Sequence, residues 1–263
     1  MKKKKAIIGM IHVQALPGTP KNELTMEKIT TRALQEAQIY QKHGIDAIII
    51  ENMHDVPYLN REVGPEIIAC MTAIATCIKK EISLPTGIQI LAGANIEALA
   101  VAKAAGLEFI RAEGFVFSHI ADEGKMDSDA GKLLRYRKQI GAEEVRVFTD
   151  IQKKHSSHAI SSDVTITQHA ETAEFFLSDG LIITGSATGK EPQLSDIKQV
   201  RKQTDLPILL GSGINTKNIE EYWDLADGFI IGSYFKEESY WKNKLSESKI
   251  KDLLNKANEL KSK

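Results

Sequence analysis

Short apolar runs alternate with amphipathic stretches from one end of the chain to the other. Most of the runs are rich in isoleucine, valine and leucine and have few internal polar residues, which is typical of strands buried on both faces of a parallel sheet. Strands are predicted at Ala6–Ile11, Ala47–Ile50, 86–91, 107–115, Val145–Asp150, Leu181–Ile183, Pro207–Leu210 and Gly228–Ile231.

A stretch with helical spacing follows each apolar run. Helices are predicted at Met26–Lys42, over the segment that holds both cysteines, at 92–106, at 132–141, at Ile166–Ser178, from near Leu194, from an N-cap at Asn215 or Thr216, and from Ser246. Eight strands that are each followed by a helix predict a closed parallel (β/α)8 barrel, the TIM barrel. The alternative, a doubly wound open sheet, usually has fewer strands.

The length of 263 residues suits a single barrel domain over residues 1–263, and no linker or change of composition divides the chain. Residues 116–131 form a polar excursion after the fourth strand. The lysines at 1–5 are read as a solvated tail, because His12 and Gln14 interrupt the apolar run that would make this segment a signal peptide.

Composition excludes several classes of protein. The formal net charge is −1, so no basic field predicts binding to nucleic acid. No apolar run reaches the roughly 18 residues of a membrane span, so we expect no membrane insertion. Cys70 and Cys77 lie in one helical pattern and are expected to be buried thiols, rather than a disulfide or a metal pair. This use of cysteine fits a cytoplasmic protein.

Glycines follow the last two predicted strands. Gly211, Ser212 and Gly213 end the seventh strand, and Gly232 and Ser233 end the eighth. Barrels bind phosphate at this place, where backbone N–H groups and a helix N-terminus meet an anion. We therefore expect these five residues to bind phosphate, although tight turns alone would also explain the glycines.

Polar residues cluster at the carboxyl ends of the predicted strands, where barrel enzymes carry their catalytic groups. The catalytic candidates are His12, Glu51, Arg111, Asp150, Lys153, Lys154 and His155. The candidates for binding substrate are Asn52, Gln89, Glu113, Thr184 and Ser186. Any one of them could instead cap a helix or form a structural ion pair.

The types of these residues indicate acid–base or imine chemistry. Burial beside the barrel interior would raise the pKa of Glu51 and suit it to proton transfer. A lysine at 153 or 154 could form a Schiff base or hold an anion. Asp150 and His155 could orient one another, or bind a metal with Glu51. No HxH, HExxH or CxxC spacing supports a metal, so no cofactor is predicted and a divalent metal stays possible.

Several long motifs are similar to one known family. They are IIGMIHVQALPGTP, IIIENMHDVPY, LLRYRKQIGAE, DIQKKHSSHAI, LIITGSATG, LLGSGINTKNIEEY and DGFIIGSYFKE, in this order across nearly the whole chain. The chain resembles the BtpA family, which is named for a photosystem I biogenesis protein, and it looks closer to the branch outside photosynthesis. The resemblance implies a barrel of the ribulose-phosphate-binding type and a sugar phosphate as ligand, but no settled reaction.

Three functions are consistent with these features. The first is an isomerase or lyase that acts on a small phosphorylated metabolite such as a sugar phosphate. The second is a barrel that binds the phosphate of a nucleotide or a flavin. The third is a non-catalytic assembly factor for a membrane complex, which predicts a large exposed apolar patch. A homo-oligomer is possible in each case.

Overall fold

The computed structural model describes residues 5–185 and 191–262. Eight parallel strands close into a barrel in the order β1-β11-β10-β9-β7-β4-β3-β2. They are β1 (Ala6–His12), β2 (Ala47–Glu51), β3 (Thr86–Gln89), β4 (Phe109–Ala112), β7 (Arg146–Ile151), β9 (Gly180–Ile183), β10 (Ile208–Leu210) and β11 (Gly228–Ile231). The predicted barrel is confirmed, and the open doubly wound sheet is wrong.

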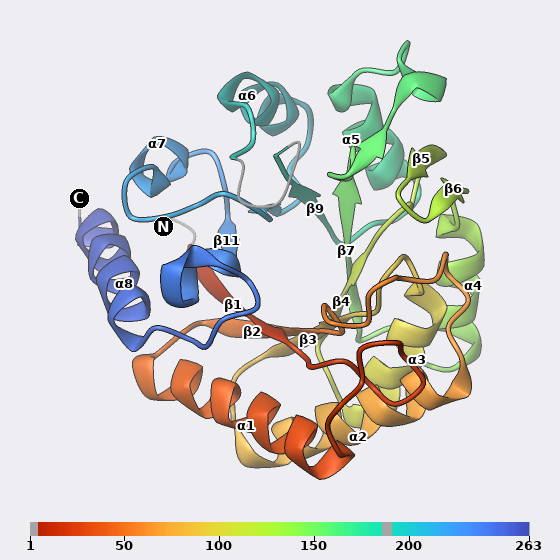
Figure 1. Cartoon of the computed structure of the whole chain (residues 1–263). Coiled ribbons are helices and arrows are strands. Elements are labelled where there is room, and N and C mark those ends of the chain that lie inside the picture. Colours follow the sequence, from red (N-terminus) through yellow and green to blue (C-terminus); the bar gives the residue numbers. More distant parts are fainter. Residues whose placement is uncertain (1–4, 186–190, 263) are drawn as a thin grey trace.

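A helix follows every barrel strand, as the hydrophobic spacing predicted, and Figure 1 shows these helices surrounding the strands. They are α1 (Met26–His43), α2 (Pro65–Glu81), α3 (Asn95–Ala105), α4 (Ala130–Gln139), α5 (Ile166–Phe175), α6 (Leu194–Gln203), α7 (Ile219–Tyr222) and α8 (Glu247–Ser262). Short 3-10 turns lie at η1 (Ala159–Ser161), η2 (Ser233–Phe235) and η3 (Glu237–Ser239). Helix α1 ends at Gly44 in the left-handed conformation (φ 76°), a common way to end a helix.

Two helices differ from the prediction. Helix α7 has only four residues and is preceded by Asn218, not by Asn215 or Thr216. The side chains of Asn215 and Asn218 accept backbone N–H groups of this segment, which holds residues 215–218 in a turn. Helix α5 ends at Phe175 instead of Ser178, and Leu177 beyond it has a φ of 64°, which no continuing helix allows.

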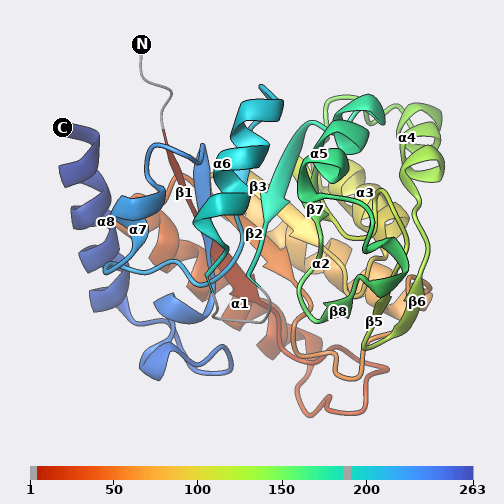
Figure 2. The same cartoon turned by 90° about the horizontal axis from the view of Figure 1, so that it is seen from above.

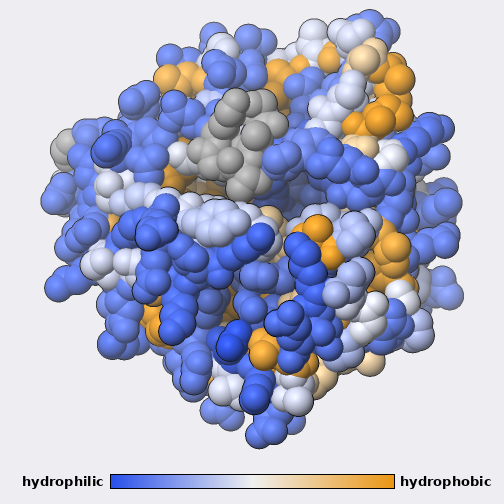
Figure 3. All heavy atoms as spheres, viewed as in Figure 1, coloured by the Kyte–Doolittle hydropathy of each residue, from blue (hydrophilic) through white to orange (hydrophobic). Residues whose placement is uncertain are grey.

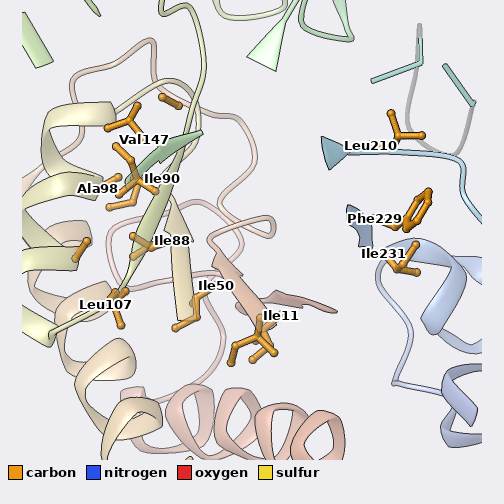
Figure 4. Close-up of a cluster of buried hydrophobic side chains, with 14 of the residues drawn as sticks. Ile11, Ile50, Ile88, Ile90, Ala98, Leu107, Val147, Leu210, Phe229 and Ile231 are labelled. Carbon is orange, nitrogen blue, oxygen red and sulfur yellow. The ribbon is translucent and has the colours of Figure 1, made fainter. Parts of the chain in front are cut away.

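Two layers of apolar side chains hold the barrel together. Alternate strand residues such as Ile11, Ile50 and Ile88 point outward into the larger cluster between strands and helices, part of which Figure 4 shows. The inner cluster consists of Ile8, Met10, Ala47, Ile49, Phe109, Ile182, Leu209 and Ile230. Gly87 makes room for this layer, because a Cβ there would lie 2.2 Å from the ring of Phe109.

A small second sheet lies outside the barrel. It contains β5 (His119–Ala121), β6 (Gly124–Met126) and β8 (Ser156–Ser157), all antiparallel. The sequence predicted only a polar excursion at 116–131, so these strands are a finding of the structure. They join the loop after β4 to the loop after β7. Figures 1 and 2 place this sheet on the opposite side of the barrel from α8.

The two cysteines are free thiols on α2. Both are partly exposed, so the expectation that they are buried is wrong. They border a groove between α1 and α2. Among the helices described here, none is long and apolar enough to cross a membrane.

Candidate active site

Side chains along a strand point alternately inward and outward, and this alternation places the polar residues at the strand ends in one layer inside the barrel. Ile8 and Met10 point into the barrel, so His12 at the end of β1 points inward too. On β2, Ala47 and Ile49 point into the barrel, so Glu51, two residues further along, points inward as well. The strand ends that share this inward direction are His12, Glu51, Gln89, Arg111, Asp150, Thr184, Gly211 and Gly232. They form a polar ring on top of the inner apolar cluster.

A cavity of about 240 Å³ opens above this ring. Its lining includes His12, Glu51, Arg111, Lys154, Gly211, Ser212, Gly213, Ile214, Asn215, Gly232, Ser233, Tyr234 and Ser239. All five residues predicted to bind phosphate line it, and four of the seven predicted catalytic residues do so. The structure therefore brings the two predicted groups together in one place.

The glycine side of the cavity presents backbone donors. Within the described ranges, no acceptor receives the N–H groups of Gly213, Ile214, Ser233 or Tyr234. Two of these groups follow β10 and two follow β11, so they approach the cavity from neighbouring strands. Unpaired N–H groups that converge in this way are the usual means of holding an anion without lysine.

Local contacts fix the direction of the first pair of donors. Gly213 has a φ of 72°, a left-handed conformation that favours glycine. Its carbonyl accepts the side-chain amides of Asn215 and Asn218 at 3.2 and 2.9 Å. The N–H of Ile214 belongs to the same peptide and points the opposite way, away from both asparagines.

The helix dipole expected behind this anion site is absent on the β10 side. The four-residue α7 begins six positions after Gly213 and is too short and too distant to act there. The turn after β11 is also brief, because η2 has three residues. A hydrogen bond of 3.0 Å between the hydroxyls of Thr216 and Tyr234 ties the two loops together instead.

Charged side chains form the rest of the cavity wall. Arg111 binds Asp150 through two hydrogen bonds of 2.7 and 2.8 Å, with both side chains buried. Burial alone would lower the pKa of Arg111, but Asp150 raises it above the usual range, so the guanidinium stays charged. Burial raises the pKa of Glu51, and the charges of Arg111 and Lys154 oppose that rise. Glu51 is thus the carboxyl group best placed for proton transfer.

His12 is held as a neutral ring in one tautomer. Nδ1 lies 3.1 Å from the carbonyl oxygen of Trp241, which can only accept, so Nδ1 carries the proton. Burial, followed by the charge of Lys236, lowers the pKa of His12 to about 3. Its unprotonated Nε2 lies 3.8 Å from Oε2 of Glu51. The Nε2 lone pair of His12 can therefore accept a hydrogen bond from a protonated Glu51 or from a ligand.

The two adjacent lysines point to different places. Nζ of Lys153 lies 3.1 Å from Glu113 and 3.6 Å from Glu123, and neither partner lines the cavity. Burial works against its charge, yet these two carboxylates raise the pKa of Lys153. Lys154 lines the cavity, and burial together with Arg111 lowers its pKa. Lys154, not Lys153, therefore faces a ligand in this cavity.

Several predicted site residues serve the surrounding framework instead. Asn52 accepts the N–H of Leu91 and donates to Asp55, and Gln89 donates to Glu113. None of the predicted residues Asn52, Gln89, Glu113, Asp150 and Lys153 lines the cavity. Asp150 still acts on the cavity through Arg111.

The remaining predictions concern the rim. The side chain of His155 is exposed and outside the cavity lining, because a φ of 55° turns it outward, so the structure does not bring it to Glu51. Thr184 lines a neighbouring cavity. Ser186 lies outside the described residues. No group of three or more His, Cys, Asp or Glu in the described ranges is arranged to hold a metal ion.

Sequence reasoning missed three residues of the site. Asn215 was read as a helix cap, although an asparagine two positions after a glycine is also a turn signal. Tyr234 follows a glycine-serine pair, and the sequence analysis gave it no role. Trp241 reaches His12 across 229 positions of sequence, and no local pattern could have indicated that contact.

The sequence model of the BtpA family matches residues 3–259, nearly the whole chain. The chain belongs to the BtpA family. An uncharacterised mitochondrial protein of Caenorhabditis elegans is 50% identical over 260 residues, which cover 97% of this chain and 94% of that protein. The photosystem I biogenesis protein BtpA of Synechocystis is 32% identical over 231 residues, covering 88% of this chain and 80% of that one.

Solved structures of other barrel enzymes share the fold of this BtpA-family chain at low identity. A geranylgeranylglyceryl phosphate synthase of Thermoplasma acidophilum, solved with sn-glycerol-1-phosphate, has a TM-score of 0.61 at 12% identity and covers 98% of this chain and 95% of its own. A phosphoribosyl anthranilate isomerase of Thermus thermophilus has a TM-score of 0.60 at 13% identity, covering 97% and 99%. At such identities the likeness supports the barrel fold alone.

Proposed function

We propose that this BtpA-family protein is an enzyme that acts on a small phosphorylated metabolite, such as a sugar phosphate, as an isomerase or a lyase. The observation that carries the proposal is one cavity lined both by unpaired backbone N–H groups and by Glu51, His12, Arg111 and Lys154. The phosphate lies on the backbone donors, and the reacting carbon lies toward Glu51. The cytoplasmic location remains a prediction.

The cavity has room for a small ligand, and a second cavity of about 710 Å³ adjoins it and shares Lys154, Gly213 and Asn215. The volume of the first cavity, about 240 Å³, is below the 300–1,000 Å³ that is usual for drug-sized ligands. A sugar phosphate of three to six carbons fits within this volume. The alternative of a non-catalytic assembly factor predicts a large apolar patch, and the face in Figure 3 is mainly hydrophilic with small, separate apolar groups.

The phosphate site can be tested with inorganic phosphate and two substitutions at one position. Gly213→Asp places a negative charge beside the donors, whereas Gly213→Asn has nearly the same shape without the charge. Asparagine and aspartate both tolerate the left-handed backbone better than other residues, so strain is matched. We expect phosphate to raise the melting temperature of the parent and of Gly213→Asn.

The Asp variant should bind phosphate at least about tenfold more weakly than the Asn variant, because like charges a few ångströms apart repel by more than 1 kcal/mol even near a protein surface. Calorimetric titrations with inorganic phosphate at constant ionic strength measure the affinity of each variant. Equal phosphate affinity in the two variants would show that the anion binds elsewhere.

A further inference from the structure

The backbone is turned on both sides of the lysine pair that follows β7. Gln152 has a φ of 52° and His155 a φ of 55°, and neither is a glycine. Non-glycine residues in this conformation cost energy and concentrate at functional sites. The turn between them sends Lys153 to Glu113 and Glu123 and sends Lys154 into the cavity.

The amino group of Lys154 has no structural partner in the described part of the chain. Nζ makes no hydrogen bond there and no ion pair within 4.0 Å. Lys153 satisfies the nearby carboxylates Glu113 and Glu123, and Asp150 is occupied by Arg111. A lysine that is brought to a cavity without a partner is available to a ligand.

The surroundings of Lys154 favour its uncharged amine. Arg111 is a permanent cation on the same wall, and Asp150 already neutralises it. Burial and the charge of Arg111 lower the pKa of Lys154, which increases the fraction of neutral amine. The backbone N–H groups of the glycine loops hold the anion in the proposed function, so Lys154 is not needed for that task. A neutral buried amine is a nucleophile toward carbonyl carbon.

We propose that Lys154 forms an imine with the carbonyl carbon of the substrate, which makes the substrate class phosphorylated aldehydes and ketones. The inference rests on the proposed function and specifies the reaction at the same site. The glycine loops hold the phosphate, and the carbonyl group lies between Lys154 and Glu51 in the same cavity.

The step needs no oxidant or reductant. The lone pair of Nζ attacks the carbonyl carbon, and the electrons of the C=O double bond move to oxygen, which takes a proton from Glu51. The nitrogen then returns a proton to Glu51, Glu51 passes that proton to the hydroxyl group, and the hydroxyl group leaves as water. One C–N double bond replaces one C–O double bond, and one water molecule is released. The protonated imine then stabilises electrons that a C–H or C–C bond leaves on the neighbouring carbon.

The imine can be trapped without knowledge of the natural substrate. The protein is incubated with dihydroxyacetone phosphate and sodium cyanoborohydride, which reduces imines to stable amines. Intact mass and peptide mapping then locate the product. We expect Lys154 to be labelled at least about tenfold faster than the exposed Lys132, because the cavity holds the carbonyl group beside the amine of Lys154. Inorganic phosphate should protect Lys154 but not Lys132.

Two controls separate this inference from the proposed phosphate site. Lys154→Arg has a side chain of similar length that cannot form an imine, so it should bind inorganic phosphate and lose the fast label. Dihydroxyacetone without phosphate should label Lys154 more slowly. Phosphate binding with no preference for Lys154 would overturn the imine and leave the phosphate site intact. Fast labelling of Lys154 that phosphate does not slow would overturn the phosphate site instead.

Discussion

At the scale of single residues, Glu51 shows how position creates reactivity. It ends a strand of three isoleucines, and its side chain reaches the polar ring just above the apolar inner cluster. Burial raises its pKa, and the charges of Arg111 and Lys154 oppose that rise. Glu51 therefore holds its proton more firmly than the same carboxyl group would on an exposed loop.

We therefore predict that Glu51→Gln removes proton transfer without unfolding the protein. Glutamine keeps the shape but cannot exchange a proton, and such losses typically reduce a rate by about 10²- to 10⁴-fold. The measurement is deuterium exchange from water into bound dihydroxyacetone phosphate, followed by proton NMR. Glu123→Gln, which changes a carboxylate outside the cavity, is the control and should exchange at nearly the parent rate. An exchange rate in Glu51→Gln close to that of the parent would contradict the assignment.

At the scale of elements, the loop between β11 and α8 completes the site from a distance. Residues 236–245 close on themselves through a bridge between Lys236 and Leu245 and a hydrogen bond from Glu237 to Lys244. The loop carries Trp241 to His12 and Ser239 to the cavity. Lys236 anchors it to α1 through an ion pair of 2.5 Å with Glu36.

This anchor should be important for stability, because Lys236 is 1% exposed. Lys236→Met leaves Glu36 without its partner, and breaking a buried pair in this way costs about 3–5 kcal/mol. We expect a loss near 2–3 kcal/mol, since the side chain of Glu36 keeps 20% exposure. The double variant Lys236→Met/Glu36→Gln should recover most of it. Urea unfolding of the parent and these variants measures each step, and equal stability of the single and double variants would show that the ion pair is not the anchor.

The sequence predicted the barrel elements and the polar ring because both depend on the local spacing of apolar and polar residues. A run such as Ala47–Glu51 shows its burial directly, and the period of two assigns Glu51 to the inner layer. It could not decide between Lys153 and Lys154, since that choice depends on two left-handed residues, Gln152 and His155, that are not glycines. The turn at 215–218 was also mistaken for a helix start, because asparagine serves both structures.

At the scale of the whole molecule, buried histidines make the free energy of unfolding depend on pH. Burial is the main reason that the pKa values of His54, His119 and His169 fall to about 4 and that of His12 to about 3. Some carboxyl groups act in the opposite direction: burial raises the pKa of Asp129 to about 6, so its contribution to stability is lost as pH rises through that value. A pH profile of the parent alone therefore mixes two signs, and a single histidine must be isolated.

His169 is the histidine best suited to this test. It is 2% exposed, its ring lies 4.5 Å from the ring of Phe117, and both of its nitrogens are buried without a hydrogen-bond partner in the described chain. Between pH 6.5 and about 4 the unfolded chain binds a proton at this residue and the folded protein does not. The protein therefore loses stability as pH falls through this range, and keeps this contribution in full above it.

Replacing His169 with leucine removes the titrating group and keeps an apolar side chain against Phe117. We predict that the difference in unfolding free energy between His169→Leu and the parent moves in favour of the variant by up to about 2 kcal/mol on going from pH 8 to pH 5, the change that a shift of this size produces by linkage. Urea unfolding of both proteins at the two pH values gives the difference directly. The carboxyl groups are common to both proteins and cancel from it. If the difference is the same at pH 8 and pH 5, His169 takes up a proton as readily in the folded protein as in the unfolded chain, and the site around Phe117 is more open to water than its burial indicates.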